Sequence, residues 1–302
     1  MTPVRTSRYC LVDMLEIIFP SNESAKKLEN YLKKRFPIGY VRKLFRKNGI
    51  RLNGQRAKPD DLVQHGDRIQ IYIPFENQGA RPEGRAKLKT LFEDPELLVI
   101  NKPAGIAVHE AKEILKRDTV LGVLEAKYRR EGVAPKLVHR LDKDTSGILV
   151  VAKTEKLAKE LEALFKEGKA DKEYLCLVVG LLSQNEGKID FPLAGREGKA
   201  VRALTRFRVV KRFSETTLVR VNIETGRLHQ IRLHFANLGY PVVMDDQHGD
   251  FAFNKRFRKK FGLKRQFLHA AKITLEARGK IQTWAAPLPN DLDEALKAVG
   301  RG

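Results

Sequence analysis

Cysteine and long apolar stretches are both scarce in this 302-residue sequence. Its two cysteines, Cys10 and Cys176, lie in no Cys-x-x-Cys or His-rich pattern, which argues against a disulfide framework and a structural zinc site. Apolar runs such as 97–100 and 148–152 are strand-sized, far short of the roughly 18 residues of a membrane span. Acidic residues interrupt the only segment near the start that could form a signal peptide. We therefore expect a cytoplasmic protein with reduced thiols.

Acidic residues are also few compared with basic ones. Lys and Arg number 58 and Asp and Glu 37, so the formal net charge is +21. Such a surplus repels itself unless a polyanion neutralises it, which makes nucleic acid the leading partner. A membrane surface would instead require a basic amphipathic helix with exposed large apolar residues, and none stands out. Because 42% of the residues are hydrophobic, the chain is not a disordered basic tail, and its length suggests two domains.

The first part of the chain has the pattern of a small basic module. Helices are predicted over 24–36 and from Pro37 to about Asn48, and strands over 50–52 and 67–73. Residues 21–75 contain 13 Lys or Arg and 5 Asp or Glu, a local net charge of +8. A helix–helix–strand unit with one basic face suits a phosphate backbone. We expect this module to span residues 1–75, before a linker over 76–89, and to contact RNA through Lys43, Arg46, Lys47 and Arg51.

Residues 90–302 are predicted to form one α+β domain, with a mixed, largely antiparallel central sheet and flanking helices. The expected strands are 97–101, 148–153, 172–180, 202–210, 216–223 and 268–275, and the expected helices are 120–128, 157–165, 225–238 and 291–299.

A dense basic segment interrupts this pattern at residues 254–265. It holds seven Lys or Arg and no acidic residue, with Phe257 and Phe261 among them. Basic residues interleaved with aromatic ones suit a loop that grips RNA by phosphate contacts and stacking. The candidate RNA contacts here are Lys255, Arg256, Arg258 and Lys259.

The most polar segment, residues 139–147 (HRLDKDTSG), lies directly before the apolar strand 148–153. Its acidic spacing matches half of a calcium loop, but the twelfth position is Lys153 and not the required Glu. Residues 144–147 (DTSG) resemble the loop of an aspartic protease, but such an enzyme needs a second carboxylate of this kind, and we find none. Ser146 lies in no Gly-x-Ser-x-Gly elbow, which argues against a hydrolase nucleophile. We therefore expect no metal here and interpret Asp144, Thr145 and Ser146 as turn-capping residues.

Three segments in order resemble the signature motifs of the RluA-type family of RNA pseudouridine synthases. They are residues 139–147, 172–175 (KEYL) and 225–232 (TGRLHQIR). Residues 101–105 and 267–270 resemble two further family segments, so the resemblance covers about residues 90–290.

The front module resembles the αL RNA-binding module shared with a ribosomal protein. The similarity rests on Arg51–Gly54 and Gly66–Asp67, whereas Lys27–Leu28–Glu29 departs from the usual Arg-Leu-Asp. Together with Asp245–Asp246 and Gly249–Asp250, it makes the chain similar to the branch of the family that acts on large-subunit ribosomal RNA.

The resemblance implies the pseudouridine synthase fold and site-specific isomerisation of uridine to pseudouridine in large-subunit (23S) ribosomal RNA. That reaction breaks an N–C1′ bond and makes a C5–C1′ bond without redox change, so no cofactor is expected. The implied partner is this RNA or an assembling large-subunit particle, and we expect the protein to act as a monomer.

The resemblance also assigns roles to individual residues. Asp142 becomes the catalytic aspartate, Tyr174 the aromatic support for the flipped uracil, and Arg232 the ion-pair partner of Asp142. Whether Asp142 attacks the sugar or removes a sugar proton stays open. Arg140 corresponds to an arginine that contacts the flipped nucleotide, and Arg227 is expected to be structural or to face a phosphate. His139, His229 and His269 are expected to be hydrogen-bonding scaffold.

Overall fold

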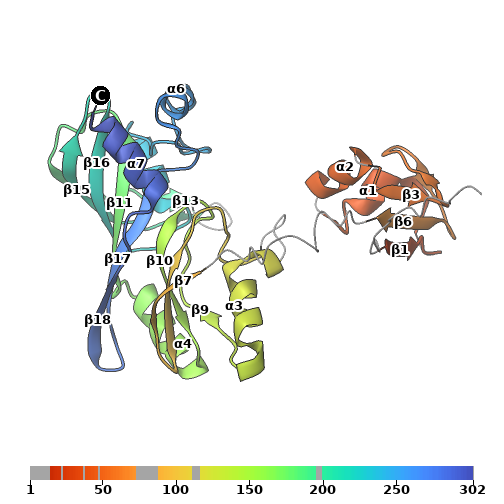
Figure 1. The fold of residues 1–302 in the computed structure, drawn as a ribbon, viewed down its shortest axis with the longest axis horizontal. Helices are drawn as coiled ribbons and strands as arrows, with labels where there is room; N and C mark the ends of the chain where they lie inside the picture. Colours follow the sequence, from red (N-terminus) through yellow and green to blue (C-terminus); the bar gives the residue numbers. More distant parts are fainter. Residues whose placement is uncertain are drawn as a thin grey trace, which may run out of the picture. The chain divides into compact units, whose positions relative to one another are not determined.

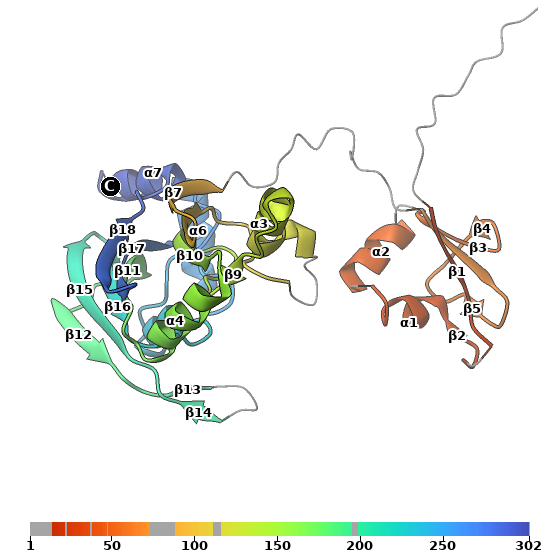
Figure 2. The same ribbon diagram turned by 90° about the horizontal axis from the view of Figure 1, so that it is seen from below.

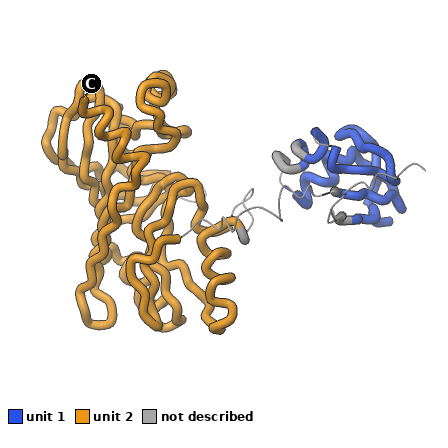
Figure 3. The backbone as a smooth tube through the Cα atoms, in the orientation of Figure 1, with its two compact units in different colours: residues 1–84, 111–113 blue, residues 85–110, 114–302 orange. Residues whose placement is uncertain are grey.

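The computed structural model describes residues 14–72 apart from 22, 37 and 47, and residues 88–110, 116–194 and 199–301. The described residues fall into two compact units, one ending at residue 72 and the other starting at residue 88 (Figures 1 and 3). The predicted linker, 76–89, lies almost entirely outside the described residues, as does Lys47.

The first unit is a small module built around a four-stranded sheet in the order β1-β6-β3-β4. Its elements are β1 (Met14–Ile18), β2 (Lys26–Lys27), α1 (Leu28–Leu32), α2 (Ile38–Arg46), β3 (Ile50–Leu52), β4 (Gln55–Arg56), β5 (Leu62–Val63) and β6 (Arg68–Tyr72). Helices α1 and α2 pack Leu28, Leu32, Val41 and Leu44 into one core with the sheet. Arg46 and Arg51 are exposed, and the side chain of Lys43 is outside the description.

The first predicted helix is much shorter than expected. Residues 26–27 pair with β5, and the amides of Leu28 and Glu29 donate to the carbonyls of Asp61 and Pro59. The chain before residue 28 is therefore bound to a neighbouring strand, and a helix starting at 24 would lose those bonds.

The second unit contains a ten-stranded sheet whose main path is β12-β15-β16-β11-β17-β10-β8-β7. Its larger strands are β7 (Lys89–Glu93), β8 (Leu97–Lys102), β10 (Ser146–Ala152), β11 (Asp171–Val179), β12 (Glu186–Ile189), β15 (Thr205–Arg212), β16 (Thr216–Ile223), β17 (Leu268–Ala277) and β18 (Lys280–Ala285). The short β9 (Lys136–Leu137) joins β10, and β13 (Leu193–Ala194) and β14 (Ala200–Val201) pair apart from the sheet (Figure 2). Every strand pairing described in this sheet is antiparallel except that of β10 with β17, which confirms the predicted α+β class.

Helices cover both faces of this sheet because successive strand residues point to opposite sides. They are α3 (Val120–Tyr128), α4 (Glu155–Lys166), α5 (Gln230–Asn237), α6 (Phe251–Phe261) and α7 (Asn290–Val299). Helices α3 and α5 share one apolar core with Leu98, Leu149 and Cys176. Helix α4 packs on Leu97 and Val150, and α6 and α7 pack on Leu177 and Leu218. None of the helices described is long and apolar enough to cross a membrane.

Two predictions for this unit differ from the structure, one in where a helix starts and one in the type of element. The helix expected over 225–238 begins only at Gln230. The preceding residue, His229, has a left-handed φ of 51°, and a right-handed helix cannot run through a residue in that conformation. The basic loop expected over 254–265 is mostly the helix α6, whose first turn is capped by the Asp250 side chain. Phe257 is buried and Phe261 packs against the same core, so neither is presented for stacking on RNA.

The parallel pair β10–β17 requires a glycine. Gly147 lies opposite Ala270 with a φ of +117°, and a Cβ there would be 2.1 Å from the Ala270 carbonyl oxygen. Only glycine allows this close approach. It brings the polar segment 139–145 against the start of β17.

Candidate active site

A buried lysine, Lys102, binds the loop that carries Asp142. The Lys102 ammonium donates to the carbonyls of Lys143 at 3.0 Å, Pro103 at 2.9 Å and Ile106 at 3.0 Å. Burial lowers the pKa of Lys102 to about 7, although the nearby Asp144 charge opposes this. The amide of Gly105 adds a 2.9 Å bond to the Lys143 carbonyl. The position of Asp142 is thus set by the segment after β8.

The sequence suggested that the side chains of Thr145 and Ser146 cap a local turn, but in the structure they bind residues far away in the chain. Thr145 Oγ1 accepts a 2.7 Å hydrogen bond from Gln266, and Ser146 Oγ lies 3.0 Å from His269 Nδ1. Both partners are more than 120 residues away in the sequence, so these hydroxyls join the loop to the start of β17. The hydrogen-bonding role expected for His269 agrees with this contact.

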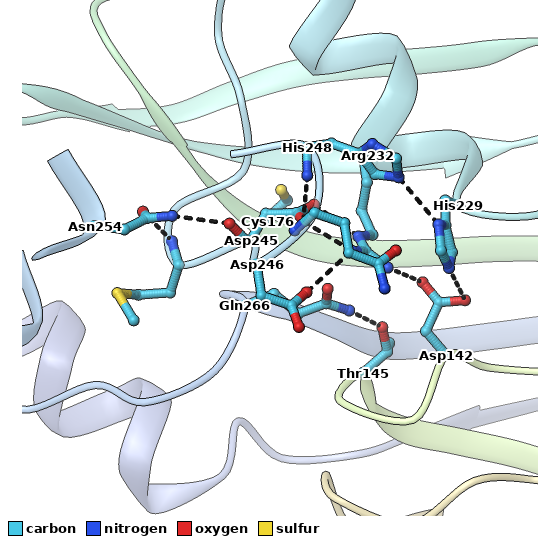
Figure 4. A network of polar contacts seen from close by, with 12 residues as sticks. Asp142, Thr145, Cys176, His229, Arg232, Asp245, Asp246, His248, Asn254 and Gln266 are labelled. Carbon is cyan, nitrogen blue, oxygen red and sulfur yellow. Dashed lines mark hydrogen bonds and ion pairs between the residues drawn. The ribbon is translucent and has the colours of Figure 1, made fainter. Parts of the chain in front are cut away.

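Arg232, from α5, lies between two carboxylates (Figure 4). Its Nε and Nη2 donate to the two oxygens of Asp245 at 2.6 and 2.7 Å, and its Nη1 donates to Asp142 Oδ2 at 3.3 Å. The structure therefore brings the predicted pair together, but the strong, two-bonded partner of Arg232 is Asp245. A weaker 3.4 Å contact reaches Asp246.

Asp245 is fully buried and accepts hydrogen bonds in addition to its ion pair with Arg232. Its Oδ1 also accepts the amides of Gln247 and His248, each at 2.9 Å. Burial alone would raise the pKa of Asp245, but these bonds and Arg232 outweigh it and hold the pKa below its ordinary value. Asp245 consequently acts as a permanent anion that fixes the Arg232 guanidinium. Sequence reasoning noted Asp245–Asp246 only as part of the resemblance.

Asp142 itself is partly accessible, with 19% of its side chain exposed. His229 Nε2 lies 4.0 Å from its Oδ1, and His229 Nδ1 is 3.0 Å from His248 Nε2. Burial lowers the pKa of His229 despite the Asp142 charge. His229 thus borders the Asp142 carboxylate, and His248 contacts His229 from its other ring nitrogen (Figure 4).

Tyr174 lies on β11, opposite Ala270 of β17, and is buried. Burial first, and the Asp142 charge second, raise the pKa of its hydroxyl. The phenol is therefore neutral at physiological pH and close enough to Asp142 to interact with its charge.

The remaining predicted site residues lie outside this cluster. Arg140 is exposed, and Arg227 is exposed with its Nε bonded to the Arg202 carbonyl at 3.1 Å. His139 accepts the Val150 amide at 2.8 Å and stacks on Phe165, as expected of scaffold. Lys255, Arg256, Arg258 and Lys259 are exposed on α6. Within the part of the chain that the structure describes, no group of His, Cys, Asp and Glu is arranged to hold a metal ion.

Comparison with known proteins gives this geometry a context. Residues 96–237 match the family model described as RNA pseudouridylate synthase. The chain is 33% identical to Ribosomal large subunit pseudouridine synthase C of Escherichia coli (strain K12), covering 94% of this chain and 96% of that relative. It is 34% identical to the Vibrio cholerae protein of the same name, covering 90% and 93%.

Among solved structures, Human RNA Pseudouridylate Synthase Domain Containing 4 superposes with a TM-score of 0.60 at 24% identity, covering 70% of this chain and 93% of that one. This similarity supports the fold, and the sequence similarities support the family. The chain belongs to the RNA pseudouridine synthases, a family of isomerases.

Proposed function

We propose that this protein isomerises specific uridines of large-subunit (23S) ribosomal RNA to pseudouridine, with Asp142 as the catalytic carboxylate. The observation that carries the proposal is the Asp142–Arg232–Asp245 arrangement, in which a buried, fixed guanidinium contacts one partly exposed carboxylate. The relatives named for the ribosomal large subunit support the class of RNA.

The reaction needs an ionised carboxylate beside the sugar of the target nucleotide. The N1–C1′ bond breaks, C1′ bonds to C5 of the same uracil, the hydrogen at C5 leaves to solvent as a proton, and N1 takes up a proton. Attack on the sugar and removal of a sugar proton both require the anionic form of Asp142. Arg232 donates to Asp142 Oδ2 at 3.3 Å and is itself held by two short bonds to Asp245, so it orients the Asp142 carboxylate.

The target base must leave its stack to reach this carboxylate. Tyr174, whose side chain is buried in this structure, would be the aromatic support that the resemblance implies for the flipped uracil; stacking of an aromatic ring on a base is worth about 1 to 3 kcal/mol. Its hydroxyl remains neutral because burial and Asp142 disfavour ionisation. Arg140 and Arg227, both exposed near the motif segments, are suited to contact the phosphates of the flipped nucleotide.

The proposal divides the chain into an RNA-binding module (residues 1–75), a linker (76–89) and a catalytic domain (90–302). Lys43, Arg46, Lys47 and Arg51 would bind the RNA backbone in the module. Acting as a cytoplasmic monomer, the protein would use free ribosomal RNA or an assembling large-subunit particle as its substrate.

The test is release of tritium from transcripts labelled at C5 of uridine, because each isomerisation frees one C5 hydrogen. We expect release from a large-subunit rRNA transcript and none from small-subunit rRNA or tRNA. Asp142→Asn should abolish release and leave RNA affinity within a few fold, since the amide keeps the shape but loses the charge. Release by Asp142→Asn in a single turnover would contradict the assignment of Asp142. Release confined to another RNA would contradict the substrate class.

A further inference from the structure

Helix α6 presents an exposed aromatic ring beside the candidate active site. Phe251, at the start of the helix, is 63% exposed, whereas Phe253 and Phe257 on the same helix are buried in the core. Because most of its side chain is exposed, Phe251 contributes little to the hydrophobic core. Sequence reasoning assigned stacking to Phe257 and Phe261 and overlooked Phe251.

Phe251 shares one face of α6 with three cations. Lys255, Arg258 and Lys259 lie four, seven and eight residues after it, which places all four side chains on one side of a helix. These four residues line one wall of a cavity of about 390 Å³. That volume lies within the range of small-ligand sites, roughly 300 to 1,000 Å³.

The lining of the same cavity also includes residues of the candidate active site. Asp245 and Asp246, the partners of Arg232, line it together with Asp144, two residues after Asp142. Asn254 fixes this arrangement, because its side chain accepts the Met244 amide at 2.7 Å and donates to the Asp245 carbonyl at 2.8 Å (Figure 4). Residues 245–246 therefore belong both to the lining of the cavity and to the surroundings of Arg232.

The charge of the cavity favours an anion. Among the residues that the structure describes, Lys255, Arg258, Lys259 and Lys264 have no acidic group within ion-pair distance. Arg265 is already paired with Asp291, and Asp245 is neutralised by Arg232. Asp144 and Asp246 remain as the opposing charges, so the cations outnumber them by two.

We infer that this cavity binds an unpaired nucleotide of the substrate RNA close to the target uridine, with its base stacked on Phe251 and its phosphate held by Lys255, Arg258 and Lys259. The inference rests on the proposed function for its RNA substrate. A flat aromatic face and mobile cations recognise a nucleotide without reading its sequence. Such a nucleotide would anchor the strand next to the flipped uridine.

The aromatic contact is tested with Phe251→Ala, Phe251→Tyr and a control, Ile281→Ala, which truncates another exposed apolar side chain (76% exposed) on β18. The probe is a large-subunit rRNA transcript, with Kd measured by filter binding and the rate of tritium release measured at saturating RNA. We expect Phe251→Ala to raise Kd about fivefold or more, the loss of stacking worth about 1 kcal/mol. Tyr should restore the parental Kd, and Ile281→Ala should keep it.

The contact between the phosphate and the lysines is tested by substituting two neighbouring lysines of α6, one at a time. Lys259 lines the cavity, whereas Lys260 lies outside its wall, with its ammonium 4.9 Å from the Phe261 ring centre. Each substitution by Ala removes one charge, so diffuse attraction would weaken binding equally. We expect Lys259→Ala to raise Kd at least three times more than Lys260→Ala.

Crosslinking tests the place directly. Transcripts carrying 4-thiouridine beside the target uridine should crosslink to the α6 peptide that contains Phe251, and Phe251→Ala should lose the crosslink. Parental Kd for Phe251→Ala, or equal effects of Lys259→Ala and Lys260→Ala, would overturn the inference. If the parent released no tritium from any transcript, the proposed function would fail, while the Kd comparison would still decide whether the cavity binds RNA.

Discussion

At the scale of single residues, one guanidinium holds two carboxylates on unequal terms. Arg232 makes two short bonds to the buried Asp245 and one 3.3 Å bond to Asp142. The charge of Arg232 is thus committed to Asp245, and Asp142 receives a single directional contact. The second oxygen of Asp142 receives no bond from Arg232 and lies 4.0 Å from His229 Nε2 in a side chain that is 19% exposed.

Substitution of Arg232 should therefore harm activity even when the charge is kept. Lysine donates from a single nitrogen and cannot span both carboxylates as the planar guanidinium fork does. We expect Arg232→Lys to lose at least 90% of the single-turnover rate of tritium release. Asp245→Asn should show a similar loss, because it frees the guanidinium to turn. Parental rates for both variants, with unchanged RNA affinity, would show that this geometry does not matter.

A second residue-scale feature is the half-buried imidazole of His139. Burial, and secondarily the charge of Lys172, lower its pKa to about 3. The unfolded chain takes up a proton on this side chain below pH 6.5, whereas the folded protein does so only near pH 3. Stability is therefore lost as the pH falls through this interval, by up to about 1.4 kcal/mol per pH unit.

His139→Gln removes this titration and keeps a hydrogen-bond acceptor for Val150. The free energy of unfolding, measured in urea between pH 6.5 and 4, should fall less steeply with pH in the variant than in the parent. His234 and His269, whose pKa values burial also lowers, retain their share of the slope in both proteins. Parallel curves would mean that His139 is not kept neutral by the fold.

At the scale of elements, the active-site loop depends on contacts from β8 and β17. Lys102 ends β8 and donates to three carbonyls, one of them in the loop. Gly147 lets β10 approach β17, and Gln266 and His269 bind the hydroxyls of Thr145 and Ser146. The loop is therefore bound to both strands that flank β10, which fixes the position of the proposed catalytic carboxylate.

Lys102→Met tests this support with a side chain of similar length. Three carbonyls lose a hydrogen bond, that of Ile106 in a buried contact and those of Pro103 and Lys143 in partly buried ones, and an unpaired buried acceptor costs about 1 to 3 kcal/mol. We expect the free energy of unfolding to drop by about 2 to 5 kcal/mol and the rate of tritium release to fall. Lys143→Ala is the control, since its side chain is exposed and only its carbonyl is used; it should change stability by less than about 0.5 kcal/mol. Equal stability of the two variants would contradict the supporting role of Lys102.

At the scale of the whole molecule, the surplus of 21 positive charges is spread over both units. The first unit buries its own apolar core and exposes basic residues such as Arg46 and Arg51. The second unit carries the carboxylate site and the basic helix α6. Binding and chemistry should therefore be separable.

Replacing Lys43, Arg46 and Lys47 by Ala tests this division. Each lost phosphate contact should reduce the slope of log affinity against log salt concentration by about 0.9 on a duplex. Affinity at low salt should fall, while the rate of tritium release at saturating RNA should stay within twofold. A rate that saturating RNA does not restore would mean that the first unit takes part in catalysis.

The sequence by itself determined the α+β class, the basic character and the place of Asp142, because periodicity, composition and local motifs are properties of neighbouring residues. It predicted most strands and helices of the second unit within a few residues. The tertiary structure alone decided that α5 starts after a left-handed His229, that residues 251–261 form a helix, and that Asp245 holds Arg232. It also decided that Phe257 is buried and Phe251 is exposed. These features arise from packing between segments that lie far apart in the chain, where burial and hydrogen-bond partners, and not local propensity, set the conformation.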